Sequence, residues 1–159
     1  MNLQSIKTQL TNNSIFYSED AVMDKPSVIG YEKKFRWAWM ATQMNTFVVA
    51  TDIGEEPVTK AVLESHLNEA FRYAQKHYKG WPRGLQSGLA VISIVLGKQV
   101  EQEAKDYCTG LKSGKKWAAM TIPVACDTTT SEAYFFTSNP MWGAIYFPHF
   151  KRIIQAAIA

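Results

Sequence analysis

The segment from Pro57 to Gly80 constrains the fold most, because its apolar residues repeat at the spacing of an amphipathic helix. With about 100° between successive residues, one side of that helix carries Val62, Leu63, Leu67, Ala70, Phe71, Ala74 and Tyr78. Pro57 suits the first helical turn, and Gly80 suits a left-handed cap after the last turn. The sequence therefore predicts a helix over 57–80 that covers an apolar surface.

Apolar stretches suited to buried strands flank this helix on both sides. The first ends at Asp52 and has an uninterrupted centre at 46–50, and the second runs from Leu89 to Leu96. The order strand, helix, strand favours a parallel, right-handed βαβ unit. We therefore predict one α/β domain, with a mixed sheet of about five strands, a central βαβ unit and helices packed on the sheet. An α+β arrangement is the alternative.

The N-terminal third predicts a lead-in segment followed by a hairpin. We expect residues 1–30 to form a lead-in with a short helix over 3–10 and a surface loop over 18–24, followed by the single domain at 31–159. The alternation of Phe35, Trp37 and Trp39 with smaller or charged residues is typical of a strand. It predicts a β-hairpin that turns near 43–45, although no Asn-Gly turn signal is present.

The C-terminal part predicts three further elements. A second helix is expected over 100–110, and an antiparallel hairpin is expected from the strands at 117–125 and 133–136. Pro123 would place its strand at an edge or a bulge, because proline cannot donate to a strand ladder. A final helix is expected to start at Ser138 or Asn139 and to be kinked or divided at Pro148.

Composition excludes several classes of protein. The chain has 159 residues, of which 47% are apolar and 19% are charged, which is typical of a globular domain. Its formal net charge of +3 is mild and spread out, so charge predicts neither nucleic-acid nor membrane binding. No apolar run approaches the roughly 20 residues of a membrane span, and the first residues lack a secretory pattern. A soluble, cytoplasmic protein is expected.

Cys108 and Cys126 have neither Cys-x-x-Cys spacing nor flanking histidines. They predict reduced, buried thiols, and a disulfide between them is left open. Neither cysteine has a neighbouring histidine that would activate it as a nucleophile. We therefore expect both thiols to belong to the core.

Three carboxylate and amine groups are the catalytic candidates. Asp52 closes a buried strand, and Glu103-Ala-Lys105 has the spacing found in metal-dependent nucleases of the PD-(D/E)xK kind. Those enzymes hold their acids and lysine on adjacent strands, whereas Glu103 and Lys105 lie in an expected helix. A solvated helix face is therefore the competing interpretation.

The loop between the central helix and the next strand is the ligand-binding candidate. It offers Trp81, Arg83, Gln86 and Ser87 beside glycines whose amides can approach an anion. The phosphate-binding motifs GxxxxGK[ST] and GxGxxG are absent, and the loop precedes a strand instead of a helix. An ordinary connector is the competing interpretation.

Histidines on the central helix offer a weaker site. His66, Tyr73 and His77 form a stripe at the border of its apolar face. His66 and His77 lie about 16 Å apart along a helix, too far to share one ion, and HExxH is absent. No metal site is therefore predicted, and the sequence names no cofactor.

Aromatic residues carry the functional hypothesis. Five tryptophans lie near cations, and such residues can form a base-stacking platform, a core face or a protein interface. The set comprises Trp37, Trp39, Trp81, Trp117 and Trp142, beside Lys33, Arg36, Lys116 and Lys151. Because no catalytic set converges, we predict a non-enzymatic binding or interaction protein that self-associates through an aromatic surface. A metal-dependent hydrolase or nuclease and a small-ligand binder are the alternatives, and a nucleic-acid partner is not favoured.

Overall fold

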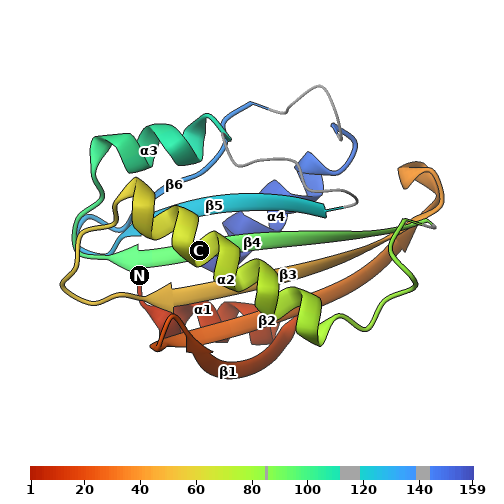
Figure 1. Cartoon of the computed structure of the whole chain (residues 1–159), viewed down its shortest axis with the longest axis horizontal. Helices are drawn as coiled ribbons and strands as arrows, with labels where there is room; N and C mark the ends of the chain where they lie inside the picture. Colours follow the sequence, from red (N-terminus) through yellow and green to blue (C-terminus); the bar gives the residue numbers. More distant parts are fainter. Residues whose placement is uncertain (85, 112–118, 139–143) are drawn as a thin grey trace.

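A six-stranded mixed sheet organises the computed structural model, which describes residues 1–84, 86–111, 119–138 and 144–159. The strands lie in the order β1-β2-β3-β4-β5-β6 (Figure 1). They are β1 (Phe16–Val22), β2 (Lys25–Arg36), β3 (Thr42–Asp52), β4 (Ser87–Gly97), β5 (Ala119–Asp127) and β6 (Glu132–Tyr134). Strands β3, β4 and β5 are parallel, and the other neighbours are antiparallel. The α/β prediction is confirmed, with one strand more than expected.

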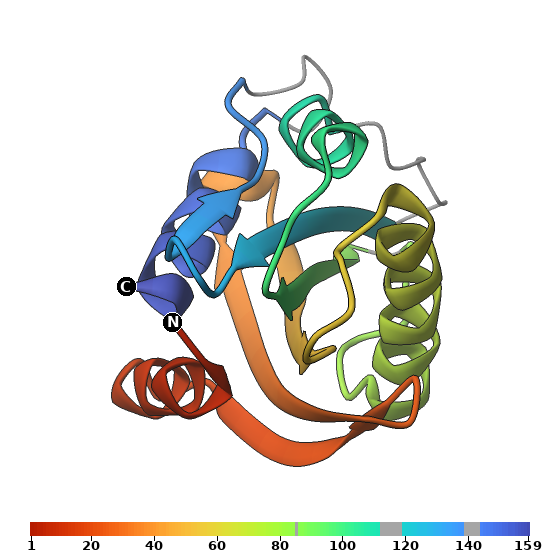
Figure 2. The ribbon, with the colours of Figure 1, turned by 90° about the vertical axis from the view of Figure 1, so that its left-hand side faces the viewer.

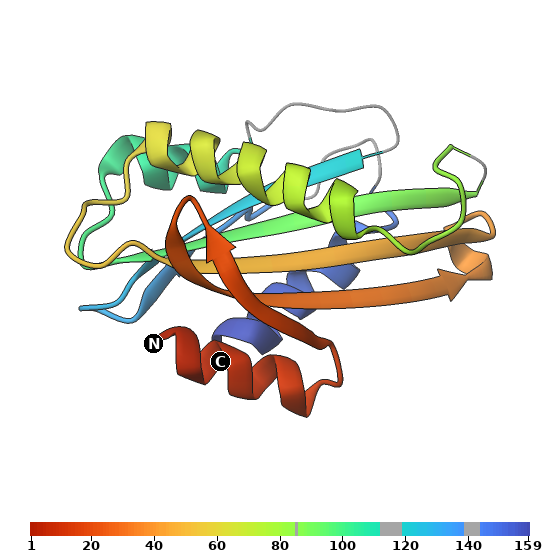
Figure 3. The ribbon, with the colours of Figure 1, turned by 60° about the horizontal axis from the view of Figure 1, so that its bottom comes forward.

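Helices cover both faces of the sheet (Figure 3). On one face lie α2 (Lys60–His77) and α3 (Gln102–Thr109), and on the other lie α1 (Leu3–Asn12) and α4 (Phe147–Ile158). Alternate residues of β3 serve the two layers, since Phe47 and Val49 pack toward α2 whereas Val48 and Ala50 pack toward α1 and α4. No helix in the described ranges is long and apolar enough to span a membrane.

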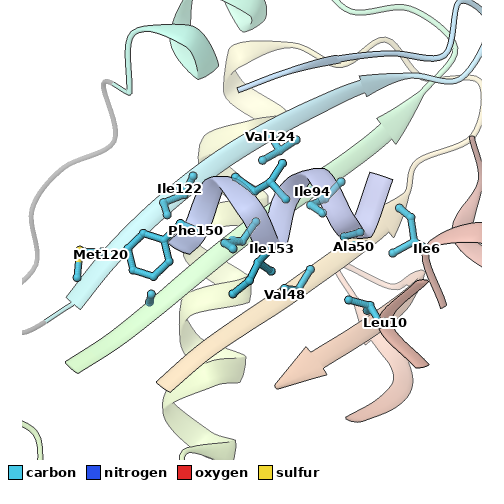
Figure 4. Close-up of a cluster of buried hydrophobic side chains, with 14 of the residues drawn as sticks. Ile6, Leu10, Val48, Ala50, Ile94, Met120, Ile122, Val124, Phe150 and Ile153 are labelled. Atoms are coloured by element: carbon cyan, nitrogen blue, oxygen red, sulfur yellow. The ribbon is translucent and has the colours of Figure 1, made fainter. Parts of the chain in front are cut away.

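The α1 and α4 helices lie side by side across one face (Figure 2). Gln9 Nε2 donates a hydrogen bond to the carbonyl of Ala159 at 3.2 Å. In Figure 4, Phe150 and Ile153 of α4 project toward apolar residues of the parallel strands. This layer is a buried apolar core whose α1 part includes Ile6 and Leu10.

The predicted central helix is confirmed, but its ends differ. The helix begins at Lys60, because the Thr59 side chain accepts a hydrogen bond from the amide of Val62 at 3.2 Å and caps it. Pro57 lies outside, and Gly80 does not adopt a left-handed conformation. The parallel pairing of β3 and β4 on either side of α2 confirms the predicted βαβ unit.

Two predictions in the N-terminal third were wrong. Of the residues expected as a surface loop, 18–22 belong to β1, which pairs along β2. Met23 and Asp24 form the tight turn between the two strands, and both are left-handed. The hairpin turn does not fall at 43–45, which lies inside β3; it falls at the 3₁₀ turn η1 (Trp37–Trp39) and the two residues after it. Trp37 and Trp39 therefore leave the strand, whereas the helix predicted over 3–10 is confirmed.

The elements after residue 100 agree more closely with the sequence predictions. The helix predicted over 100–110 and the β5-β6 hairpin are confirmed. Strand β6 pairs only with Ala125–Asp127, so Pro123 lies where β5 has a described partner on one side alone, as an edge proline requires. The α4 helix begins at Phe147 and not at Ser138 as predicted, and Asn139 lies outside the described residues. Pro148 occupies the first turn of α4, so it does not kink or divide this helix.

Candidate functional site

Exposed aromatic rings gather where β2 turns into β3 beside the loop that leads to β4. Figure 1 shows these two segments in orange and light green at one end of the sheet. Phe35 is 39% exposed, Trp37 81% and Trp81 47%. The ring of Phe35 lies 5.2 Å from that of Trp37 and 5.9 Å from that of Trp81. We call these three residues the aromatic tip. Met40, in the same turn, is 80% exposed.

The segments that carry the aromatic tip are basic. Residues 33–41 and 78–86 contain five cations and no aspartate or glutamate; the cations are Lys33, Lys34, Arg36, Lys79 and Arg83. The Arg36 guanidinium lies over the ring of Trp39 at 5.0 Å, and the Lys79 amine lies over the ring of Tyr17 at 5.4 Å. Lys34 pairs with Glu32 at 3.7 Å, so the positive charge beside the aromatic rings comes from Lys33, Arg36, Lys79 and Arg83.

A buried asparagine fixes the backbone behind the tip. Asn45 in β3 is fully buried, and its Oδ1 accepts a hydrogen bond from the Tyr31 hydroxyl at 2.7 Å. Its Nδ2 lies within 3.4 Å of acceptors on Gln43, Tyr78, Ser87 and Gly88. One amide therefore ties strands β2, β3 and β4 to the start of the loop after α2.

The same network holds the main chain of Trp81 on both sides. The Trp81 amide donates to Gln43 Oε1 at 3.1 Å, and the Trp81 carbonyl accepts a hydrogen bond from the Tyr78 hydroxyl. The Tyr78 hydroxyl has one proton and donates it to that carbonyl. The hydrogen bond between Tyr78 and Ser87 must therefore be donated by Ser87 Oγ. The indole of Trp81 is thus displayed from an anchored loop.

The turn between β2 and β3, which carries Trp37, has a strained backbone. Met40 and Ala41 both have φ of 54°, a left-handed conformation in two successive residues that are not glycine. Each such residue costs roughly 1–2 kcal/mol relative to a right-handed one. Strain of this kind concentrates at functional loops, so it is consistent with a turn whose shape serves the display of Trp37 and Met40.

The four ligand-binding candidates divide between two roles. Trp81 belongs to the aromatic tip, and Arg83 is exposed nearby. Ser87 is buried in the Asn45 network, and with Gln86 it lines a hollow of about 250 Å³ that also includes Met44. The loop therefore does not present all four side chains to one ligand.

The three catalytic candidates each have a separate contact. The Asp52 carboxylate accepts a hydrogen bond from the Gly54 amide at 2.8 Å. Glu103 pairs with Lys60 at 3.2 Å, and Lys105 lies over the ring of Tyr134 at 4.5 Å. No hydrogen bond or ion pair joins these three candidates in the described part of the chain. Nor do the described residues contain a group of three or more His, Cys, Asp or Glu side chains that could hold a metal.

His66 is buried, and does not border the apolar face as the sequence suggested. Its Nδ1 lies 2.6 Å from Ser93 Oγ and its Nε2 lies 2.7 Å from Thr51 Oγ1, which in turn contacts Ser27 Oγ at 2.7 Å. Burial lowers the pKa of His66 to about 4, so the ring is neutral near pH 7. The sequence signal for this contact was a polar residue inside each of two apolar strands, Thr51 in β3 and Ser93 in β4. These hydrogen bonds join α2 to the sheet, and the residues that make them are buried.

Both cysteines are buried and free, as expected for core thiols. Burial raises the pKa of Cys108 and that of Cys126 to about 12. A nucleophilic cysteine needs a thiolate near neutral pH, which these environments oppose. Among the tryptophans, Trp39 is buried, and Trp117 and Trp142 lie outside the described residues.

Comparisons with protein-family models, with curated proteins and with solved structures found no match.

Proposed function

We propose that this protein is a binding module that docks a partner protein on the aromatic tip. The observation that carries the proposal is the exposure of Phe35, Trp37 and Trp81 together on an anchored backbone. Tryptophan, methionine and arginine are enriched at the centres of protein interfaces. An anchored loop also loses less conformational freedom on binding than a free one, which favours affinity.

A protein partner suits this tip better than a nucleic acid. Base stacking uses the open faces of successive rings. In the tip, the Phe35 ring meets that of Trp37 edge-to-face at 84° and that of Trp81 at a tilt of 55°, so the rings form a ridge in which neither tryptophan lies parallel to Phe35. A ridge of this shape fits an apolar groove on a folded partner or a bound peptide.

The charges favour an acidic partner. Five cations and no acids occur in the two segments of the tip. Complementary charge speeds association and opposes wrong partners. Self-association, which the sequence suggested, would bring two positive surrounds together. It is the second candidate, because two apolar ridges can still bury each other when salt screens that repulsion.

A displayed library of random peptides tests the proposal directly. Wild-type protein is expected to select peptides rich in acidic and large apolar residues, and a synthetic copy of one is then titrated by calorimetry. The variant with Trp37→Ser and Trp81→Ser should bind it at least about tenfold more weakly, as expected for hot-spot residues. Phe16→Ser is the matched control, since Phe16 is 36% exposed but lies on β1.

Three results would reject an acidic protein partner at the tip. They are selection of the same peptides by the double variant, selection of basic peptides, and tight binding of labelled single-stranded DNA that needs Trp37 and Trp81. Light scattering at low and high salt tests the second candidate. A dimer fraction that rises with salt concentration and is lost in the double variant would show that the partner is a second copy of the chain and not an acidic protein.

A further inference from the structure

Acidic side chains gather at the end of the molecule opposite the aromatic tip. This end consists of the connections 23–25, 52–60, 97–103 and 127–132, three of which follow the carboxyl ends of the parallel strands β3, β4 and β5. Figure 2 views the molecule from this end. The four connections contain eight acids and three cations, a net charge of −5. The acids are Asp24, Asp52, Glu55, Glu56, Glu101, Glu103, Asp127 and Glu132. We call these four connections the acidic end.

The acidic end and the aromatic tip are too far apart to meet within one chain. Strand β3 begins at Thr42, just after the turn that carries Trp37, and finishes at Asp52 in the acidic end. At roughly 3.3 Å per residue, this strand separates the two surfaces by about 33 Å. Figure 1 shows them at opposite ends of the sheet. A contact between the tip and the acidic end therefore needs two copies of the chain.

The cations of the acidic end do not neutralise it, because each already pairs with an acid of the same end. The ion pairs are Lys25 with Glu56 at 2.9 Å, Lys60 with Glu103 at 3.2 Å, and Lys98 with Glu55. The side chains of these three glutamates are 60–81% exposed. Asp24 and Glu101 are also exposed, and neither forms an ion pair with another described residue. The acidic end therefore presents excess negative charge to solvent.

Two prolines give the acidic end an apolar surface between its charges. Pro26 and Pro57 are both exposed. The ion pair of Lys25 with Glu56 joins the two segments that carry them. Aromatic side chains are the usual lining of sites that bind proline residues. The acidic end thus offers what the aromatic tip would bind, which is negative charge beside rings that an indole can pack against.

We propose that the acidic partner of the aromatic tip is the acidic end of a second copy of this chain, an inference that rests on the proposed function of the tip. In this contact the rings of Trp37 and Trp81 pack against Pro26 and Pro57. The four cations beside the rings lie near the exposed glutamates. Opposite charges therefore meet, whereas a contact between two tips brings like charges together.

The contact is head-to-tail, because it joins two different surfaces. A copy that is bound through its tip keeps a free acidic end, and a copy that is bound through its acidic end keeps a free tip. The assembly therefore grows into a chain or closes into a ring, whereas a contact between two tips stops at a dimer. Salt weakens a contact between opposite charges and strengthens one between like charges, so the two arrangements respond oppositely to salt.

Light scattering of the wild-type chain over a range of salt concentrations tests the proposal. The protein is expected to associate at low salt and to dissociate as the salt concentration rises. The acidic peptide selected by the tip should also dissociate it, because the peptide occupies the tip. Both measurements use wild-type protein, so neither depends on the folding of a variant.

Two variants each remove one side of the contact. The tip variant carries Trp37→Ser and Trp81→Ser, and the acidic-end variant carries Glu55→Lys and Glu56→Lys. Each alone should associate at least about tenfold more weakly than wild type at low salt. An equimolar mixture should form a one-to-one dimer, because one variant keeps its acidic end and the other keeps its tip.

A charge-matched control carries Glu19→Lys and Glu69→Lys, which lie on β1 and α2. It should associate like wild type. Circular dichroism confirms that each variant is folded before it is used.

Three results would overturn the proposal. They are a wild-type protein that stays monomeric at low salt, a mixture of the two variants that forms no dimer, and an acidic-end variant that associates as strongly as wild type. If the tip still binds the acidic peptide in these samples, the proposed function stands and the partner is another protein. If the tip binds neither the peptide nor a second copy, the proposed function is wrong as well.

Discussion

Gly80 packs directly against the side-chain amide of Asn45. A Cβ at Gly80 would lie 2.4 Å from Asn45 Nδ2 and 2.5 Å from the Tyr78 hydroxyl. Real Cβ atoms do not approach other atoms so closely, so the loop that carries Trp81 can reach the sheet only because residue 80 is glycine.

Gly80→Ala should therefore lower the free energy of unfolding by about 1–3 kcal/mol, the usual cost of overpacking a tightly packed site. Urea unfolding measures this loss. In an Asn45→Ala background the same change should cost at least about 0.5 kcal/mol less, because the clashing amide is gone. An equal cost in both backgrounds would show that Asn45 is not the group that excludes a side chain at position 80.

His66 should make stability fall between about pH 6.5 and pH 4. Its folded pKa is lowered to about 4 from an unfolded value of 6.5, so below pH 6.5 the unfolded chain binds a proton that the folded chain does not. The stabilisation is complete above pH 6.5, and about 2 kcal/mol of it is lost by pH 5. His66→Gln keeps polar partners for Thr51 and Ser93 but cannot titrate. Its unfolding free energy should lack this component, and parallel pH curves for the two proteins would contradict the assignment.

Cys108 and Cys126 should resist thiol reagents in the folded protein. Their pKa values of about 12 leave almost no thiolate at pH 7, and both side chains are buried. Absorbance with an aromatic disulfide reagent should show negligible release from the native protein and reaction of both thiols in concentrated guanidinium chloride. Rapid labelling without denaturant would mean that the core around α3 and β5 opens readily.

Thr46→Val should leave the free protein equally stable or make it more stable. The Thr46 hydroxyl is buried without a hydrogen-bond partner, so its removal relieves a desolvation cost of roughly 1–3 kcal/mol. Thermal unfolding without added ligand measures the change. A loss of more than about 1 kcal/mol would indicate that this hydroxyl already has a partner in the free protein.

Ala41→Gly should raise stability by about 1 kcal/mol, because glycine adopts the left-handed conformation at φ of 54° without steric cost. Ala38→Gly is the matched control. Ala38 lies in η1 of the same turn without a positive φ, so the added backbone entropy should make that variant less stable. Equal changes in the two variants would contradict strain at Ala41.

The βαβ unit could be read from the sequence, since it depends on local periodicity. Leu63, Leu67 and Phe71 recur at helical spacing, and the apolar strands on either side must pair to bury themselves beneath that face. The hairpin turn could not be read in this way, because Met40 and Ala41 adopt a conformation that residue preferences assign to glycine or asparagine.

The aromatic tip and the contact between Glu32 and His149 do not follow from local pattern. Trp37 and Trp81 become neighbours of Phe35 only because β2, β3 and β4 pair in a particular register beside an anchored loop. Glu32, Thr46 and His149 meet because strand pairing sets the first two opposite each other and α4 docks across them.

The sequence by itself determined the fold class, the central helix and the buried strands, because the burial of apolar area follows the short repeats of helix and strand. Only the tertiary structure decided which rings stay exposed and which polar atoms stay without partners. Those outcomes depend on strand register and helix docking, which bring together residues far apart in the chain and leave no repeat in the sequence.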